Sequence, residues 1–144
     1  MLRLPLVVAH LTMAAVWLGS MTYSLAVVQP KTARFFPSER AREDFLVVLA
    51  HGNRWRVVAL VAALLITDTA LYVLTGGFGY LTALPLYAIA GGIFVHVSWR
   101  HWPARVFALD HELAGYRKRL RIMATTMTAL VGAAFLVVLT WSVR

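Results

Sequence analysis

Four long apolar stretches limit what this chain can fold into more than any other feature. They cover residues 4–28, 57–75, 78–99 and 122–143, and each is close to or above the roughly 20 residues that a helix needs to cross a bilayer. Of the 144 residues, 60% are hydrophobic and 14% are charged. So short a chain cannot enclose that apolar fraction in a water-soluble core. We therefore expect residues 1–144 to form a single all-α integral membrane domain, a four-helix bundle with the lipid bilayer as its solvent.

The positive charge of the chain is confined almost entirely to two connecting segments. Residues 29–56 and 100–121 each carry six Lys or Arg residues. The two remaining basic residues are Arg3, before the first apolar stretch, and Arg144, after the fourth. The positive-inside rule places both basic segments in the cytoplasm and both termini outside, in a bacterial plasma membrane. The net charge of +8 then attracts anionic lipid, and no nucleic acid is expected as a partner. The first stretch exceeds the apolar core of a typical signal peptide, so we expect it to remain as a span.

Further helical structure is expected in the basic segments. Ser38, followed by a glutamate and then an apolar run, is typical of a helix N-cap. We expect the second helix to begin near Ser38 and to continue through the second apolar stretch. Residues 105–122 have the pattern of a short amphipathic helix that leads into the fourth stretch.

Three titratable side chains interrupt the apolar stretches, namely His10, Asp68 and His96. At a helical rise of 1.5 Å per residue, His10 and Asp68 lie about 9 and 10 Å below the same edge of the bilayer. An ionisable group in lipid costs several kcal/mol, so Asp68 should face the interior with His10 as its partner. His96 lies near the opposite edge of the bilayer, and the hydrated interface there tolerates a histidine that has no specific role. The alternative is that His96 is a further cofactor ligand.

The pairing of His10 with Asp68 has two interpretations. It is either an interhelical hydrogen bond that fixes packing, or a site at which His10 ligates a metal or haem iron and Asp68 orients the ring. Trp17 shares the helical face of His10 and could wall such a pocket. Met13 and Met21 lie on the same face as soft copper ligands or as packing residues. The chain has no cysteine, which excludes thiolate ligands.

The spacing of His10, Trp17, Gly19 and Pro30, written H-x6-W-x-G-x10-P, resembles the first helix of two groups of small bacterial membrane proteins. One is the copper-resistance protein D (CopD) group, and the other is the HemJ group of haem-binding protoporphyrinogen oxidases. The stretch NRWRVVALVAALLITDTALYVLTGG is similar to the second helix of CopD-type domains. The resemblance covers the first two helices. It implies either haem b held by the first-helix histidine in a membrane oxidoreductase, or copper passage.

Three functions therefore stay open. The first is a haem- or metal-binding redox protein for electron transfer, with His10, Trp17, Asp68 and His96 near the cofactor. The second is copper transport through His10, Met13 and Met21, and the third is a non-catalytic accessory subunit of a larger membrane complex. His10 is the single histidine in the outer half of the predicted bundle. An iron bound there would be five-coordinate, take a different sixth ligand, or be shared across a homo-oligomer.

Overall fold

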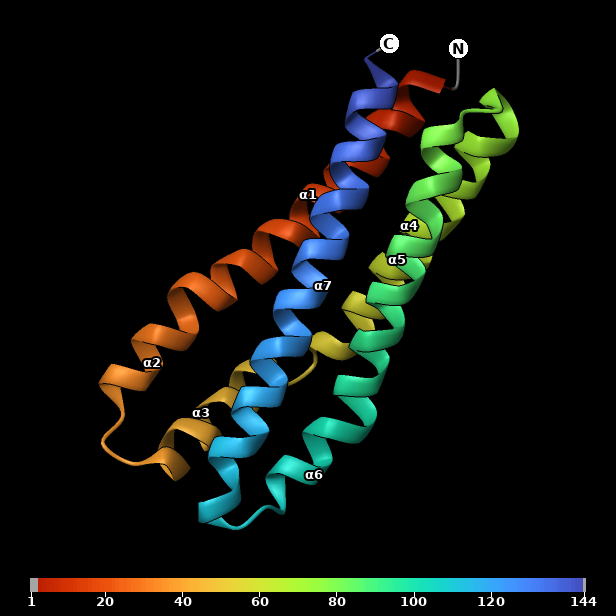
Figure 1. The fold of residues 1–144 in the computed structure, drawn as a ribbon. Coiled ribbons are helices and arrows are strands. Elements are labelled where there is room, and N and C mark those ends of the chain that lie inside the picture. Colours follow the sequence, from red (N-terminus) through yellow and green to blue (C-terminus); the bar gives the residue numbers. More distant parts are fainter. Residues whose placement is uncertain (1–2, 144) are drawn as a thin grey trace.

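The computed structural model describes residues 3–143, which are almost entirely helical and contain no strand. Four helical segments are long and apolar enough to cross a membrane, as the four stretches predict: Arg3–Phe35, Asn53–Thr75, Phe78–Val106 and Leu113–Ser142. In Figure 1 the start of the first, the turn between the second and third, and the end of the fourth lie together. We call this the terminal end of the bundle. The connection at residues 107–112 and the start of the connection at residues 36–52 lie at the opposite end, which we call the loop end, and residues 39–50 run from there back to the start of the second segment.

Two of the long segments contain a π-helical turn. The first comprises α1 (Arg3–Tyr23), a π turn (Ser24–Val28) and α2 (Gln29–Phe35). The third comprises α5 (Phe78–His96), a π turn (Val97–His101) and α6 (Trp102–Val106). In both cases a proline, Pro30 or Pro103, follows the π turn by two residues. Proline has no N–H for the carbonyl one turn earlier and its ring crowds that carbonyl, which explains a wider turn at these points.

The predicted continuity of the second helix is wrong. Helix α3 (Glu39–Ala50) is separate from α4 (Asn53–Thr75), because the chain turns at His51 and Gly52. Gly52 adopts a left-handed conformation with φ of 74°, which is favourable for glycine and interrupts the helix. The predicted N-cap is confirmed, since Ser38 Oγ accepts the backbone N–H of Ala41 at 3.1 Å.

The expected amphipathic helix before the fourth stretch is also not a separate element. After a short 3-10 turn (Asp110–Glu112), α7 runs without interruption over Leu113–Ser142. Its first turns carry the basic residues of the loop end, and its later turns form the fourth apolar segment. No glycine or proline lies at the junction near Ile122 to end a helix there.

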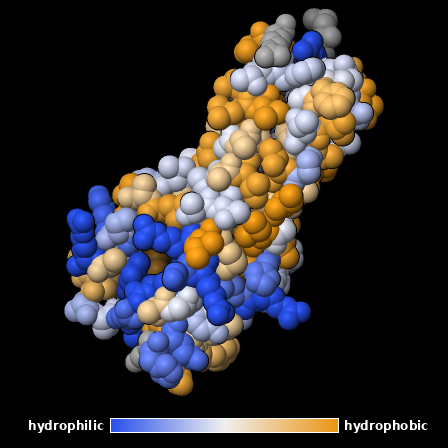
Figure 2. Space-filling model, viewed as in Figure 1, coloured by the Kyte–Doolittle hydropathy of each residue, from blue (hydrophilic) through white to orange (hydrophobic). Residues whose placement is uncertain are grey.

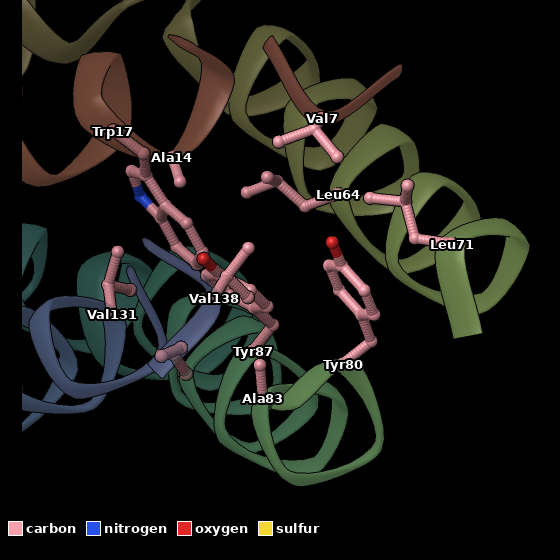
Figure 3. Close-up of a cluster of buried hydrophobic side chains, with 12 residues drawn as sticks. Val7, Ala14, Trp17, Leu64, Leu71, Tyr80, Ala83, Tyr87, Val131 and Val138 are labelled. Carbon is pink, nitrogen blue, oxygen red and sulfur yellow. The ribbon is translucent and has the colours of Figure 1, made fainter. Parts of the chain in front are cut away.

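Helix α5 packs against both α4 and α7 and supplies much of the core. Its inward face carries Tyr80, Ala83, Tyr87 and Ala90, which meet Trp17 and Val131 in the apolar cluster of Figure 3. The approach to α4 is close: a Cβ added at Gly91 would lie 2.7 Å from Val61 Cγ1. This contact fixes how α5 is rotated, and the rotation determines which of its side chains face the interior.

The outer surface changes character along the bundle. Figure 2 shows apolar residues over the long helices toward the terminal end and hydrophilic residues gathered at the loop end. Many large apolar side chains point outward from the helices, among them Val16, Ile66, Val73, Ile89 and Leu136. Such a surface is suited to contact with lipid rather than with water.

Candidate functional site

His10 and Asp68 lie side by side in the interior, on α1 and α4. Both side chains are fully buried, and His10 Nε2 lies 3.8 Å from Asp68 Oδ1. The proximity predicted from their depths is thus confirmed. The distance is too long for the direct hydrogen bond that a purely structural pairing requires.

The hydrogen bond of His10 is made instead with Thr67, which the sequence pattern did not indicate. His10 Nδ1 lies 2.8 Å from Thr67 Oγ1, and Thr67 Oγ1 donates its hydrogen to the Ala63 carbonyl, also at 2.8 Å. A hydroxyl has one hydrogen, so with that hydrogen on the Ala63 carbonyl Thr67 Oγ1 accepts from His10 Nδ1–H, whereas with it on His10 Nδ1 the imidazole hydrogen is on Nε2. In the first of these tautomers the free lone pair is on Nε2, the nitrogen that lies 3.8 Å from Asp68 Oδ1.

Tyr87 of α5 completes the site. Its ring packs edge-on against the His10 ring, with centroids 5.5 Å apart and an interplanar angle of 74°. The Tyr87 hydroxyl is buried and has no hydrogen-bond partner among the described residues. The same holds for His10 Nε2 and for both carboxylate oxygens of Asp68. We refer to His10, Thr67, Asp68 and Tyr87 as the His10 cluster. Its four unpartnered polar atoms are unusual, because buried polar atoms normally have a protein, water or ion partner.

The other predicted site residues are distributed around or away from this cluster. Trp17 is buried in the apolar core two helical turns from His10. Met13 and Met21 are half-buried and pack against that core. His96 is exposed and lies on α5 about 14 Å from Tyr87 along the helix, at 1.5 Å per residue. The structure therefore brings His10 and Asp68 together and leaves His96 outside the cluster.

The donors of the cluster fit a small cation better than haem. No group of three or more His, Cys, Asp or Glu side chains suited to a metal occurs among the side chains that the structure describes, so the protein donors are one imidazole, one carboxylate and the Tyr87 phenol. Metal bonds of about 2.0–2.2 Å to nitrogen and oxygen allow one ion to contact two atoms 3.8 Å apart. A haem would need open space beside His10 Nε2, whereas that nitrogen is fully buried against Asp68. As packed, the bundle does not fit haem at His10.

A second group of polar side chains holds α3 at the loop end. Glu43 on α3 accepts from Arg105 on α6 at 2.5 Å in a buried ion pair, and Glu39 pairs with Arg117 on α7. Arg42 donates to the carbonyl of Gln29 at 3.2 Å. Burial, together with the positive charge of Arg117, lowers the pKa of Arg42, which nevertheless stays charged. These contacts fix α3 against three other helical elements.

Comparisons of the chain with known protein families, with curated proteins and with solved structures found no match.

Proposed function

We propose that this chain is an integral membrane protein that binds a transition-metal ion, copper in the first place, at the His10 cluster. The observation that supports it most directly is His10 Nε2, a buried nitrogen with a free lone pair, held toward Asp68 by the Thr67 hydrogen bond. Neutral imidazole is the commonest metal ligand in proteins, and a fixed ring orientation raises its affinity. Copper is favoured because it binds nitrogen and oxygen ligands most tightly among the divalent first-row metals.

Charge balance supports a cation at this place. An uncompensated charge in the bilayer interior costs several kcal/mol, so an ionised Asp68 needs a positive partner. A bound metal ion supplies that charge, and deprotonation of Tyr87 would balance the second charge of a divalent ion. The methionines are less involved than the sequence suggested, since Met13 and Met21 pack against apolar side chains. We therefore favour copper on imidazole and oxygen ligands over copper on thioethers.

The role we propose is copper transport, the function implied by the resemblance to the copper-resistance protein D group. The alternative, a haem-dependent redox protein, is disfavoured because the packed site lacks room for a macrocycle. A non-catalytic accessory subunit remains the outcome if no metal binds. In that case the His10 cluster would act only in helix packing.

We further propose that the four long helices cross a bacterial plasma membrane with both termini outside. The twelve basic residues in segments 29–56 and 100–121 support this orientation. Trp55 and Trp99, whose rings are 5.7 Å apart, fit an interface near the loop end, and Arg54 lies 4.7 Å over the Trp99 ring. The His10 cluster would then lie in the outer half of the bilayer.

The metal proposal is tested by titrating detergent-purified protein with Cu(II) and Zn(II) and measuring affinity and stoichiometry. We expect one tight Cu(II) site per chain, which is lost in His10→Ala and weakened in Asp68→Asn. His96→Ala is the control histidine variant and should bind as the parent does. A haem Soret band in the purified protein that disappears in His10→Ala would overturn the proposal in favour of the redox function. Absence of any tight metal site would favour the accessory subunit.

The orientation is tested by labelling single cysteines in intact cells with a membrane-impermeant reagent. Lys118 and Phe78 are exposed positions at the loop end and the terminal end. We expect Phe78→Cys to react from outside and Lys118→Cys to react only after the cells are opened. The reverse pattern would show that the orientation is wrong.

A further inference from the structure

An open groove lies at the loop end between α2 and α3. It has a volume of about 560 Å³ and is lined by Lys31, Thr32, Arg34, Phe35, Phe36 and Phe45. The three phenylalanine rings form a continuous apolar surface, with Phe36 at 5.1 Å from Phe35 and 5.2 Å from Phe45 between ring centroids. Phe35 is 79% exposed and Phe45 is 40% exposed. Such a surface is unfavourable in water and needs an apolar ligand or the lipid bilayer against it.

The groove is formed by a rigid corner of the chain. Helix α2 ends at Phe35, the chain extends through Phe36, and α3 begins after the Ser38 cap. The hydrogen bond from Arg42 to the Gln29 carbonyl joins α3 to the start of α2. On its other side, α3 is held by the buried pair of Glu43 with Arg105. The groove is therefore preformed, which lowers the entropic cost of binding.

The charge at the rim of the groove is positive. Lys31 and Arg34 are exposed and make no ion pair with any carboxylate whose side chain the structure describes. Both belong to the last turns of a membrane-length helix, so in the membrane arrangement proposed above, on which this step rests, they lie where lipid headgroups begin. Apolar walls with a cationic rim are complementary to an amphiphile with an anionic head.

We propose that this groove is a binding site for an anionic phospholipid. The phenylalanine rings contact an acyl chain, and Lys31 and Arg34 bind the phosphate of the headgroup. Basic residues near a membrane surface attract anionic lipid, and a phosphate with an attached chain uses both parts of the groove. The lipid then joins α2 to α3 at the loop end. This site is independent of metal binding at the His10 cluster.

The site is tested by native mass spectrometry of the full chain released from detergent with phosphatidylglycerol or phosphatidylcholine. We expect one tightly retained phosphatidylglycerol per chain and a clear preference over phosphatidylcholine. The double variant Lys31→Gln, Arg34→Gln should bind phosphatidylglycerol about 30-fold more weakly, the effect of two basic residues near an anionic surface. Lys118→Gln, Arg119→Gln removes the same charge from exposed positions outside the groove and should leave this affinity nearly unchanged.

Two further measurements separate the possible ligands. Phe45→Ser should weaken phosphatidylglycerol binding, and inorganic phosphate should not displace the lipid, because the acyl chain contributes to binding. Circular dichroism checks that each variant keeps its helical content.

Equal losses of phosphatidylglycerol affinity in the two double variants, or no preference for phosphatidylglycerol, would overturn the proposal in favour of general attraction to the membrane. Displacement by inorganic phosphate would show an anion site without a lipid site, and dimers that exclude lipid would show a protein interface.

Discussion

The hydroxyl of Thr67 lies 2.8 Å from Nδ1 of His10, and this contact determines which imidazole nitrogen is free to act. With the Thr67 hydrogen on the Ala63 carbonyl, the hydroxyl accepts from Nδ1–H. The lone pair of the neutral ring is then on Nε2, 3.8 Å from the Asp68 carboxylate. A histidine in an apolar helix thus has a defined orientation, and its free nitrogen faces a carboxylate.

Thr67→Val should weaken metal binding while the protein stays folded. The substitution keeps the size of the side chain but removes the acceptor for Nδ1–H, and loss of such an orienting partner typically lowers metal affinity 10- to 100-fold. The matched control is Thr69→Val, because Thr69 is exposed one residue beyond Asp68 and bonds only to its own helix at 2.7 Å. Copper titration of both variants measures the effect. Equal affinities for the two would rule out an orienting role of Thr67.

Tyr87→Phe should lower copper affinity without destabilising the protein. The Tyr87 hydroxyl is buried and has no hydrogen-bond partner in the part of the chain that the structure describes, so its removal should cost no hydrogen bond in the metal-free state. Tyr80→Phe is the comparison, since the Tyr80 hydroxyl lies 3.2 Å from Ser142 Oγ. That variant should lose about 1 kcal/mol of stability and keep its copper affinity. Thermal unfolding and copper titration of both proteins test the contrast, and an unchanged affinity in Tyr87→Phe would exclude Tyr87 as a ligand.

Gly91→Ala should destabilise the bundle, whereas Gly92→Ala should not. A Cβ at Gly91 would lie 2.7 Å from Val61 Cγ1, and the stiff valine side chain has little freedom to move away. Overpacking of this kind costs about 1–3 kcal/mol. A Cβ at Gly92 meets nothing within 4 Å in the described structure. Thermal unfolding in detergent distinguishes the two, and equal melting temperatures would contradict the close contact of α5 with α4.

Glu43→Gln should destabilise the loop end far more than Glu39→Gln. Glu43 is buried with Arg105, and breaking a buried pair leaves an uncompensated charge at a cost of about 3–5 kcal/mol. Glu39 is half-exposed and pairs with Arg117 at the surface, where such pairs contribute about 0–1 kcal/mol. Hydrogen exchange over residues 39–50 measures the stability of α3 directly. Similar exchange in both variants would show that the Arg105 pair does not hold α3 in place.

The sequence predicted the four long helices because apolar length and charge placement are properties of the chain alone. It also predicted that His10 and Asp68 would meet, since depth follows from the rise of a helix. Tyr87 was missed because the rotation of α5 depends on tertiary contacts such as Gly91 against Val61. The face of α5 that carries His96, together with Pro85, Ile89 and Gly92, points outward.

Thr67 and the end of α3 were missed for different reasons. Thr67 directly precedes Asp68, and neighbouring positions of a helix lie on different faces, so the helical spacing of the inward residues does not include Thr67. The signal in the sequence is indirect: a buried histidine needs a hydrogen-bond partner that fixes its tautomer, and a hydroxyl at the same depth on the neighbouring helix can be that partner. The break lies in a stretch with helical residues on both sides, and it is made by the extended ψ of His51 (134°) together with the left-handed conformation of Gly52.

The central claim is that His10 Nε2 ligates a metal ion inside the bundle, and electron paramagnetic resonance of the Cu(II)-loaded protein tests it most directly. One bound imidazole should give nitrogen coupling in the spectrum of the parent protein. We predict that this coupling disappears in His10→Ala and persists in His96→Ala, with circular dichroism showing that both variants are folded. Nitrogen coupling that survives in His10→Ala, or that disappears in His96→Ala, would contradict the account.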